Sequence, residues 1–527
     1  MFFILHKMLP VILYSEFYFS IQYPVSSIQY PVSSIQHPTF TYLCPVNKND
    51  KYQVVIGLEV HAQLLTKAKL FCSDSTLFGS EPNTQVSPIS LAHPGTLPKM
   101  NKKAIELAVK LGLALHCEIE KHNYFARKNY FYPDLPKGYQ VSQHTAPICK
   151  GGYLTVTTPE GKKDVQLNRI HLEEDAGKSI HDVDENYTCI DLNRAGVPLL
   201  EIVTEPCIHS AEEAFSFLTE LRKMVRWLEV CDGNMEEGSM RCDANISVRL
   251  MGEITLGKRV EVKNLNSIRN VKRAIEIETE RLIGITEKNE TIIQETRSFD
   301  ADKNTTFSLR SKEEADDYRY FPEPDLPPFN ITDKYINDIS RSMPVLPEQL
   351  KEKYITQYAL SEYDASVISN DKEDADFFES LILHTKHFKP AANWMLGPLK
   401  FYCNENNISI AVFPLPVSTI ASLIELTESG KVNFNNASTR MLQELIKNPG
   451  ETALSIATSL NLIQESDSGA IENWVDEVIA SMPDKIKEYK SGKKGLIGLF
   501  AGEVKKKSKG KADMQLVNKL LAEKLNQ

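Results

Sequence analysis

Strict alternation of polar and apolar residues predicts a half-buried β-strand at 241–249. The apolar side carries Cys242, Ala244, Ile246 and Val248, and the polar side carries Arg241, Asp243, Asn245, Ser247 and Arg249. Asp and Asn are poor strand formers, so their presence in the middle of a strand weakens its local propensity. Departures of this kind are expected at functional sites.

Three further segments, 54–61, 170–175 and 259–263, alternate in the same way. Their polar sides carry Glu59 and His61, then His171, Glu173 and Asp175, and then Arg259, Glu261 and Lys263. A polar sheet face is most often simply wetted by solvent. Acids at matched positions of four strands favour instead one shared face that holds a metal ion and the phosphates it bridges.

Helical spacing of apolar residues follows three candidate N-caps. One helix is expected at about 102–112 after Asn101, a second after the capping box Ser210–Glu213, and a third from Asn266 or Ser267. Strands mixed with helices, and the hairpin-like spacing between 249 and 259, predict an α+β domain with a largely antiparallel sheet.

The length of 527 residues exceeds a single hydrophobic core, so two to four domains are expected. The stretch Asp325–Pro328 marks a boundary, because the sequence becomes helical beyond it, at 333–341, 346–358 and 361–382. We therefore predict four parts. They are a leader or targeting segment at 1–50, a catalytic domain at 51–330, a helical domain at 331–430 and a helical tail at 431–527.

The first 50 residues differ from the rest of the chain. The heptapeptide Ile-Gln-Tyr-Pro-Val-Ser-Ser occurs at 21–27 and again at 28–34, in a stretch with almost no charge and several prolines. Such a composition does not build a core, so we expect a disordered leader. It contains no Arg, which is unlike a mitochondrial transit peptide, and its role and cleavage point stay open.

Composition and charge narrow the class of protein. With 42% apolar and 25% charged residues the chain is typical of a soluble globular protein, and no run of about 18 apolar residues predicts a membrane span. Nine scattered cysteines, none in a Cys-x-x-Cys pair, indicate reduced thiols in an intracellular compartment. The net charge of −10 means that any contact with nucleic acid must be local.

One local basic cluster lies in the predicted tail. Its residues are Lys493, Lys494, Lys505, Lys506, Lys507, Lys509 and Lys511, and the last five are the predicted tRNA-binding residues. Lysines interspersed with glycines suit contact with a phosphate backbone, and a solvated helix face is the alternative.

Seven ordered motifs resemble a known family. They are Gly-Leu-Glu-Val-His at 57–61, Tyr-Phe-Tyr-Pro-Asp-Leu-Pro-Lys-Gly-Tyr-Gln at 130–140, His-Leu-Glu-Glu-Asp-Ala-Gly-Lys at 171–178, Asp-Leu-Asn-Arg-Ala-Gly at 191–196, Arg-Cys-Asp-Ala-Asn at 241–245, Lys-Asn-Leu-Asn-Ser at 263–267 and Asp-Tyr-Arg-Tyr-Phe-Pro at 317–322. Over about 52–525 the chain resembles the B subunit of the glutamyl/aspartyl-tRNA amidotransferases (GatB), in its mitochondrial type.

The resemblance implies a carbon–nitrogen ligase that needs ATP and Mg²⁺. Misacylated glutamyl-tRNA(Gln) is phosphorylated at the glutamate side chain, and ammonia then displaces the phosphate to give glutaminyl-tRNA(Gln) for mitochondrial translation. The resemblance further implies a catalytic domain similar to glutamine synthetase, a glutaminase A subunit and a small C subunit as partners, and the mitochondrial matrix as the location. Activity on aspartyl-tRNA(Asn) and the stoichiometry of the complex stay open.

On these grounds we predict the residues of the active site. The predicted catalytic residues are Glu59, His61, Glu173, Arg241, Asp243 and Lys263. The predicted Mg²⁺ ligands among them are Glu59, His61, Glu173 and Asp243. The predicted ATP-binding residues are Asn193, Arg194, Asn245 and Arg259. Mg²⁺ takes carboxylate and phosphate oxygens, and cationic side chains offset the charge of a transferring phosphoryl group. Glu174 points away from Glu173 in an ideal strand, so only one of the two should reach the metal unless a β-bulge intervenes. Which of the two binds the metal stays open.

Several motifs also allow a purely structural role. His171 is expected to be a satisfied structural histidine rather than a ligand. Arg194 either touches the substrate or pairs with Asp191 in a turn. The aromatic run Tyr130–Tyr132 either packs in the core or lines a pocket for the acceptor end of tRNA, and Arg319 either stacks on nucleic acid or packs at a domain edge.

One departure from the family pattern concerns zinc. Many bacterial members carry two cysteine pairs near the start, whereas here Cys72 stands with Asp74, Ser87 and Ser90. Zinc normally takes four ligands, so no zinc is expected, and the loop should hold itself by packing. The departure resembles the organellar branch of the family.

Two other functions compete with this prediction. A tRNA-holding scaffold that has lost its kinase centre is disfavoured by the acids at 59, 173 and 243. A free-standing amide ligase for a small substrate is disfavoured by the basic tail. ATP hydrolysis with and without glutamyl-tRNA separates all three.

Overall fold

The alternating segments form one large sheet. The computed structural model of the chain describes residues 51–311, 318–464, 468–508 and 512–526, so the predicted leader at 1–50 lies outside the described residues. The main strands follow the order β15, β14, β13, β12, β1, β11, β8, β5, β4, β16 across the sheet. Every neighbouring pair in this order is antiparallel except β13 with β14, which confirms the prediction of a largely antiparallel sheet.

The strands differ widely in length. Those of the main order are β1 (Tyr52–Gln63), β4 (Ala126–Asn129), β5 (Tyr139–Ser142), β8 (Gly161–Glu174), β11 (Pro198–Thr204), β12 (Met240–Leu250), β13 (Val260–Leu265), β14 (Glu295–Asp300), β15 (Thr305–Ser311) and β16 (Phe321–Pro322). Three more belong to the sheet: β6 (Cys149–Lys150) and β7 (Tyr153–Thr158) pair with β8, and β2 (Glu118–Ile119) pairs with β6. Two small ribbons pair β9 (Lys178–Ile180) with β10 (Cys189–Asp191) and β3 (His122–Asn123) with β17 (Phe329–Asn330).

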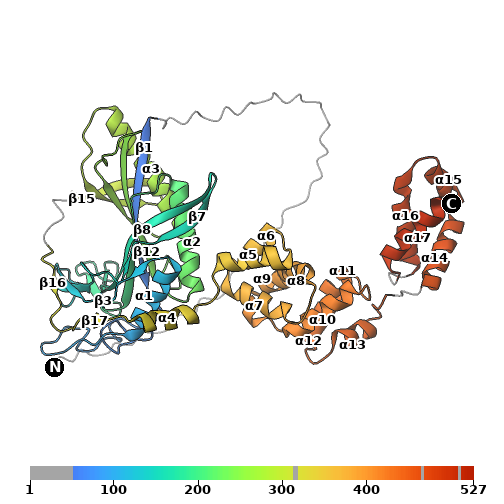
Figure 1. Cartoon of the computed structure of the whole chain (residues 1–527), viewed down its shortest axis with the longest axis horizontal. Helices are drawn as coiled ribbons and strands as arrows, with labels where there is room; N and C mark the ends of the chain where they lie inside the picture. The colour runs from blue at the N-terminus through green and yellow to red at the C-terminus, as the bar shows by residue number, and fades with distance from the viewer. Residues whose placement is uncertain (1–50, 312–317, 465–467, 509–511, 527) are drawn as a thin grey trace. The chain divides into compact units, whose positions relative to one another are not determined.

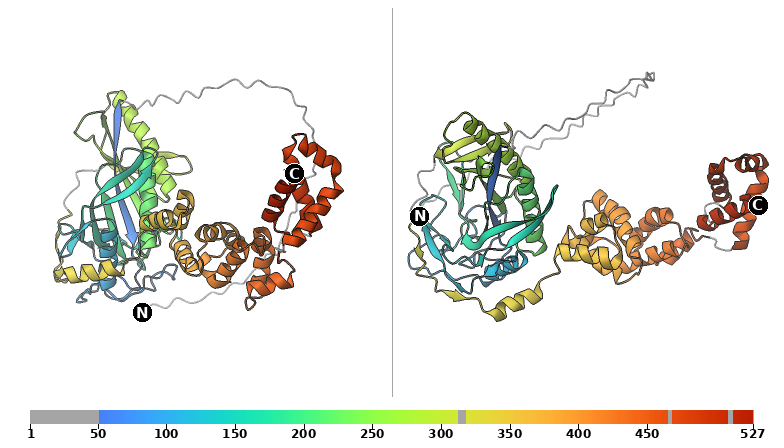
Figure 2. Two further views of the ribbon diagram at one scale, coloured as in Figure 1. Left: turned by 45° about the vertical axis from the view of Figure 1, so that its right-hand side comes forward. Right: turned by 45° about the horizontal axis from the view of Figure 1, so that its top comes forward.

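The apolar face of this sheet belongs to the main core. Leu58, Val60, Ala244 and Ile246 on the central strands β1 and β12 are fully buried. Two helices pack side by side here, α2 (Ala211–Trp227) against β7 and α3 (Ile268–Glu287) against β12, as Figures 1 and 2 show. Burial of these apolar side chains fixes which face of each strand points inward.

The three predicted N-caps are confirmed. Asn101 opens α1 (Lys102–Ala114) by accepting a hydrogen bond from the backbone of Lys103. The side chain of Ser210 opens α2 by accepting a hydrogen bond from the backbone of Glu213, and that of Ser267 opens α3 by accepting one from the backbone of Asn270. Each cap satisfies a backbone donor that has no partner inside its helix.

The opposite, polar face gathers the predicted polar residues. The register places Glu59 opposite Asp243, and His61 opposite Arg241 on one neighbouring strand and Glu201 on the other. Residues directly opposite each other in an antiparallel pair project to the same side. The polar sides of β12, β1, β11 and β8 therefore share one surface.

Beyond the sheet the chain is helical, as predicted. The helices are α4 (Asp333–Ser342), α5 (Pro347–Tyr358), α6 (Glu362–Ile368), α7 (Lys372–Ile382), α8 (Phe388–Trp394), α9 (Lys400–Asn406), α10 (Val417–Glu428), α11 (Phe434–Asn436), α12 (Leu442–Lys447), α13 (Ala453–Ser459), α14 (Ser468–Ser481), α15 (Pro483–Lys490), α16 (Ile497–Lys507) and α17 (Met514–Asn526). The single helix predicted at 361–382 is two, because the side chain of Asp371 caps a new helix, α7. Within the described ranges, no helix is long and apolar enough to cross a membrane.

Two apolar cores divide this helical part. The first core runs from Tyr52 in the sheet through α13 to Leu462, so it spans both boundaries predicted at residues 330 and 430, which stay predictions. The second core begins at Ile471 and is built from α14 to α17. The last four helices therefore have an apolar core of their own.

Candidate functional site

Acidic residues on the polar face of the sheet form two clusters. The first cluster is His61, Glu173 and Glu201, and the second cluster is Glu59, Asp243 and Glu261. In each, the candidate ligand atoms all lie within 4.8 Å of one another. Carboxylate oxygens and an imidazole nitrogen at this spacing are donor sets with which proteins hold divalent cations.

In the first cluster, His61 lies near two carboxylates. Its Nε2 is 3.3 Å from Glu201 Oε2 and 3.7 Å from Glu173 Oε1. Nε2 of His171 approaches the same two carboxylates, at 3.5 Å and 3.6 Å. The hydroxyl of Ser142 donates to Glu173 Oε2 at 3.3 Å, which orients this buried acid.

Electrostatics tie the imidazole and the acids of the first cluster together. Burial opposes a charge on His61, but its hydrogen bond to Glu201 and the charges of Glu201 and Glu173 outweigh burial and raise the pKa of His61 to about 9. Burial would raise the pKa of Glu201, but the neighbouring His171 and His61 hold it well below its usual range. A cation that binds His61 Nε2 must therefore displace a proton.

Without divalent cations, the protein should lose stability as the pH rises. The pKa of His61 is about 9 in the fold against 6.5 for the free side chain, so its pairing with Glu201 contributes fully below pH 6.5 and is lost as the pH rises through about 9. We expect a loss of about 2 kcal/mol in the free energy of unfolding across this window. Urea unfolding in the presence of a chelator measures it, and His61→Gln should flatten the pH dependence; an equally steep curve in that variant would contradict the assignment.

In the second cluster, Lys263 bridges two of the three acids. Its Nζ bonds Asp243 Oδ2 and lies 3.1 Å from Glu261 Oε1. Burial opposes the positive charge of Lys263, but the charges of these two acids raise its pKa. The pKa of Glu59 is also raised, first by burial and then by the surrounding carboxylates. Lys263 thus pairs with Asp243 and Glu261, whereas Glu59 is surrounded by other carboxylates.

An unpaired acceptor accompanies the second cluster. Asn245 Nδ2 donates to Glu59 Oε1 at 2.9 Å, whereas its Oδ1 is buried and finds no hydrogen-bond partner among the described residues. Mutually repelling carboxylates beside a buried acceptor are a set of groups that a bound cation stabilises. The residues present therefore fit a Mg²⁺ ion.

The four predicted Mg²⁺ ligands divide between the two clusters rather than meeting at one point. Glu59 and Asp243 belong to the second cluster, and His61 and Glu173 belong to the first. Residues two positions apart in a strand, such as Glu59 and His61, project to the same face but are displaced along the strand. The prediction of a shared face is confirmed, and the picture of one centre is replaced by two.

Two acids of the clusters were not predicted as site residues. Glu201 lies in the run Pro-Leu-Leu-Glu-Ile-Val at 198–203, which has no alternation because its strand is central to the sheet and mostly buried. Glu261 does lie on the polar side of its alternating segment, so the signal that could have found it was present in the sequence.

The neighbours of Glu173 resolve two open points. Glu174 faces away from the clusters, pairs with Lys137 and accepts from the backbone of Val141 at 2.9 Å. Glu173, not Glu174, is therefore the acid that lies in a cluster. His171 is not the satisfied structural histidine that was expected, because its Nδ1 is buried without a hydrogen-bond partner among the described residues, and its Nε2 faces both acids of the first cluster.

Two of the three predicted arginines, Arg241 and Arg194, meet at a different acid, Asp175. Arg241 Nη2 lies 3.0 Å from both carboxylate oxygens of Asp175, and Arg194 Nε lies 3.8 Å from one of them. Burial would raise the pKa of Asp175, but the two arginines lower it. The alternative pairing of Arg194 with Asp191 is wrong, since Arg194 instead donates to the carbonyls of residues 176 and 177.

Asn193 holds a loop rather than facing either cluster. Its side chain accepts from the backbone of Gln85 at 2.8 Å and donates to the carbonyl of Glu81 at 2.8 Å. Asp191 accepts from the backbone of Asn83 in the same region. Through these hydrogen bonds Asn193 stabilises the segment 80–85.

A cavity of about 440 Å³ opens beside the second cluster. Glu59, Asn245 and Arg259 are among its lining residues, together with Gly257 and Lys258. Two of the predicted ATP-binding residues, Asn245 and Arg259, therefore lie at this cavity, and its volume is in the range of small-molecule sites.

The loop around Cys72 is held by hydrogen bonds rather than by packing alone. Asp74 accepts from the backbone of Ser87 at 2.8 Å and from the hydroxyl of Ser90. The thiol of Cys72 lies 3.4 Å from the Ser90 hydroxyl. Burial would raise the pKa of Asp74, but these two serines lower it, so the carboxylate is the centre of the loop.

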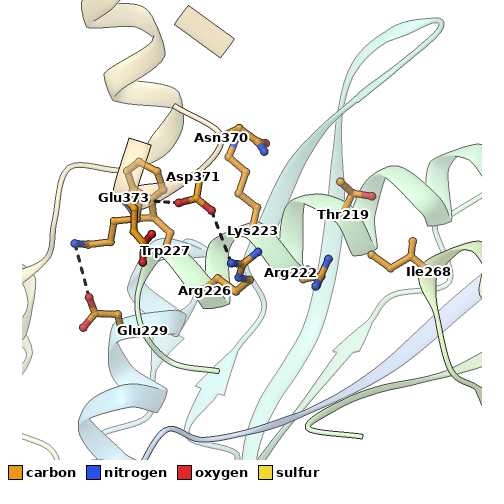
Figure 3. A pocket seen from close by; sticks show the side chains of 11 residues that line it. Thr219, Arg222, Lys223, Arg226, Trp227, Glu229, Ile268, Asn370, Asp371 and Glu373 are labelled. Carbon is orange, nitrogen blue, oxygen red and sulfur yellow. Dashed lines mark hydrogen bonds and ion pairs between the residues drawn. The ribbon is translucent and has the colours of Figure 1, made fainter. Parts of the chain in front are cut away.

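Another cavity, of about 330 Å³, lies at the C-terminal end of α2 (Figure 3). Arg226 pairs with Asp371 at 3.7 Å, and Lys372 pairs with Glu229 at the same distance. Its lining shares no residue with either acid cluster. Because these two cations are already paired with acids, we assign this cavity no part in the chemistry.

The basic cluster of the tail lies partly within the described residues. Lys505, Lys506 and Lys507 occupy the exposed last turn of α16, and Lys507 pairs with Glu477. Lys509 and Lys511 lie outside the described residues. The side chains that can be placed therefore face solvent on one helix end.

The fold and the site define a class of protein. A sheet whose polar face carries two acid clusters is followed by helical domains, and family models match both parts. Residues 54–337 match the GatB/GatE catalytic domain, and residues 376–525 match the GatB domain. The chain belongs to the GatB family.

Similar proteins occur in bacteria. One from Thermodesulfovibrio yellowstonii is 48% identical over 471 residues, which cover 89% of this chain and 98% of that protein. One from Geotalea uraniireducens is 48% identical over 479 residues, which cover 90% of this chain and 100% of that protein. Each of these relatives is named as the B subunit of an aspartyl/glutamyl-tRNA(Asn/Gln) amidotransferase.

Proposed function

We propose that this chain is the ligase subunit of a tRNA-dependent amidotransferase. It uses ATP to phosphorylate the side-chain carboxylate of glutamate on glutamyl-tRNA(Gln), and ammonia then displaces the phosphate to give glutaminyl-tRNA(Gln). The observation that carries the proposal is the pair of acid clusters on one sheet face with a cavity of about 440 Å³ beside them. The names of the relatives agree with a subunit of such an enzyme.

Phosphorylation is required because a carboxylate does not expel hydroxide, so its oxygen must first become a better leaving group. Phosphoryl transfer asks a protein mainly for positioning and for neutralisation of charge. In the proposal, the cavity beside Glu59 and Asn245 holds the nucleotide, and Arg259 at its wall faces the phosphates. Lys263, held between Asp243 and Glu261, stabilises the negative charge of the transferring group.

A bound Mg²⁺ would supply Lewis-acid stabilisation of the phosphate oxygens. Glu59, Asp243 and Glu261 would hold one such ion, and His61, Glu173 and Glu201 would hold another. The side chains of the first cluster also orient the substrate carboxylate, because His171 and Ser142 fix the positions of their acids. Arg241 keeps the neighbouring Asp175 neutralised, so that this acid does not repel the substrate.

The partners in the proposal are a glutaminase A subunit and a small C subunit. The relatives are named as one lettered subunit of an amidotransferase, which implies further subunits in their enzymes. The same names include both aspartyl- and glutamyl-tRNA, so we extend the proposal to aspartyl-tRNA(Asn), whose carboxylate presents the same chemistry. Superposition of a solved structure on glutamine synthetase would test the related sheet architecture that the family resemblance implies.

The lysines at the end of α16 are proposed to contact the tRNA backbone. Lys505 and Lys506 are exposed and carry charge in an otherwise acidic chain. Each phosphate contact should contribute about one unit to the slope of log affinity against log salt, so charge reversal of both lysines should flatten that slope. An unchanged slope would remove them from the interface.

The mitochondrial matrix is proposed as the location. The proposal depends on the family resemblance and on the Cys72 loop, in which Asp74, Ser87 and Ser90 stand where the resemblance implies thiols in many bacterial members. Imaging of a tagged full-length chain together with a matrix marker tests it, and a diffuse cytosolic signal would contradict it.

Stimulation of ATP hydrolysis by charged tRNA is the decisive test of the function. The assembled complex should release phosphate when glutamyl-tRNA(Gln) is added, because the tRNA-borne carboxylate is the phosphoryl acceptor. Uncharged tRNA is the matched control and should not stimulate release. Stimulation by free glutamate alone would favour a small-molecule amide ligase, and no hydrolysis under any condition would favour a tRNA-holding scaffold.

A further inference from the structure

A group of partly exposed aromatic rings lies next to the ends of β4, β5 and β16, three strands of the sheet that carries the acid clusters. This aromatic wall is formed by Tyr130, Tyr132, His144, Tyr318 and Tyr320. Successive ring centroids lie 5.9 Å apart from Tyr132 to Tyr130, 5.8 Å from Tyr130 to Tyr318 and 6.2 Å from Tyr318 to Tyr320, and the His144 ring stacks on Tyr320 at 3.9 Å. Tyr132 and Tyr318 remain 50% and 41% exposed.

The register shows that Lys128, whose Nζ lies over the rings of Tyr130 and Tyr318, shares the face of the first cluster. Ser142 stands opposite Glu173 and Ala126 stands opposite Ser142, so Lys128, two residues beyond Ala126, projects to the same side. Phe321 stands opposite Arg127, and Tyr320, the residue before β16, lies close enough to Lys128 for the two to interact electrostatically. The sequence of strands from β8 through β5 and β4 to β16 thus carries one continuous polar surface.

The spacing between strands gives the distance along this surface. Three steps of about 4.8 Å separate β8 from β16, the strand that follows Tyr320, or about 14 Å in all. Contacts across the surface bridge this span, because Ser142 bonds Glu173 and the hydroxyl of Tyr130 donates to Gln140 at 3.2 Å. The wall therefore lies beside the first cluster, on the side away from β1 and the second cluster.

Lys128 connects the wall to the first cluster. Its Nζ lies 5.0 Å from the ring centroid of Tyr318 and 5.7 Å from that of Tyr130. Burial opposes its charge, but Glu173, Tyr320 and Glu201 raise its pKa. A cation thus stands between an aromatic surface and the acids, at a position where an anionic or π-rich ligand would be attracted.

The segment that carries Tyr318 and Tyr320 is held in an unusual backbone conformation. Arg319 between them has a φ of +42°, in the left-handed region that favours glycine. Asn129 fixes it from both sides, since its backbone donates to the carbonyl of Tyr318 at 2.8 Å and its side chain donates to that of Arg319 at 2.7 Å. Strain of this kind persists where the surroundings over-determine it, and it concentrates at functional sites.

The wall is not needed to attach this segment to the sheet. On the other face of β4, Arg127 makes two hydrogen bonds to Glu323, at 2.7 Å and 2.8 Å, and stacks over Tyr139 at 4.2 Å. Because this ion pair already holds the segment on the sheet, the exposed rings of the wall are not needed for its attachment. A core role is excluded by the exposure of Tyr132 and Tyr318.

We propose that the aromatic wall stacks an unpaired nucleobase at the acceptor end of the tRNA and so positions the attached amino acid toward Glu173. This inference rests on the proposed function and adds the residues that recognise the substrate. Proteins bind unpaired RNA bases by stacking them on aromatic side chains, without requiring base pairing. The cavity at Glu59 and Asn245 lies on the other side of the first cluster, which leaves the wall for the tRNA rather than for ATP.

Kinetics of the assembled complex with ammonium chloride as the nitrogen source test the proposal. Tyr318→Ala and Tyr320→Ala should each raise KM for glutamyl-tRNA(Gln) about tenfold, the effect of losing one stacked base. The KM for ATP and kcat at saturating tRNA should stay near wild type. Tyr318→Phe and Tyr320→Phe keep a ring and should restore KM. Phe215→Ala, at a ring of α2 that is 40% exposed, is the matched control and should change nothing.

A fluorescent probe gives a second measurement that needs no variant. Glutamyl-tRNA(Gln) with 2-aminopurine as its terminal base should be quenched when it binds the wild-type complex, because stacking on aromatic rings quenches this base. An absent quench, an unchanged KM for tRNA in the alanine variants, or a rise in KM for ATP instead would each overturn the proposal. Failure of the proposed function itself would look different, since wild-type ATP hydrolysis would then not respond to charged tRNA.

Discussion

Replacement of Glu173 by Gln is expected to lower ATP cleavage stimulated by glutamyl-tRNA about 10³-fold, by removing one fixed charge from the reaction centre. The substitution keeps the shape of the side chain but takes away a carboxylate that is only 3% exposed and faces His61 and His171. A neutral amide is a weaker cation ligand, and it leaves Glu201 as the sole acid of the first cluster. Phosphate release at saturating ATP measures the effect.

The variant should still bind tRNA, because its altered atom lies in the cluster rather than on the exposed tail or the aromatic wall. Filter retention of labelled tRNA checks this. Glu205→Gln is a matched control, since Glu205 follows the end of β11 and bonds Asn168 outside both clusters. Full ATP cleavage by Glu173→Gln would refute the assignment of the first cluster to the chemistry.

Replacement of Asp175 by Ala is expected to cost about 3 kcal/mol in the free energy of unfolding, which is the effect of removing one partner of a buried ion pair. Asp175 is 4% exposed, and its loss strips Arg241 of two contacts at 3.0 Å and Arg194 of its nearest acid. Gln63, which donates to the same carboxylate at 2.8 Å, also loses its acceptor. Urea unfolding measures the change.

A second substitution separates charge from packing. Arg241→Met in the Asp175→Ala background removes the unpaired guanidinium, so the double variant should be more stable than the sum of the two single effects. Because arginine neighbours lower the pKa of Asp175 below its ordinary 3.8, its contribution is present above that pH and declines as the pH falls through the lower folded value. A change below about 1 kcal/mol in the single variant would show that the pair is solvated and weak.

Alternation in the sequence predicted the shared face because it reports which side of a strand is buried. The residues Glu59, Asp243 and Lys263 followed from it, and the structure places all three together in or beside the second cluster. Alternation is silent about which strands are neighbours. Glu201 was missed for a different reason, because its strand β11 is mostly buried and its sequence does not alternate.

The partners of charged side chains were harder to predict than their positions. Asp191 and Arg194 are three residues apart, which suggested a local pair, but Arg194 approaches Asp175, nineteen residues away in the sequence. Such a contact depends on the loop between two strands, and no local pattern records it.

Glu59 and His61 occupy a single strand, β1, and each belongs to a different cluster. Because successive side chains of a strand alternate between its faces, deleting the one residue between them would turn one of these two groups into the apolar core. The alternation of side chains along β1 thus fixes the distance between the two candidate cation sites. Any evolutionary change in that separation would require remodelling a strand that β11 and β12 hold in register on both edges.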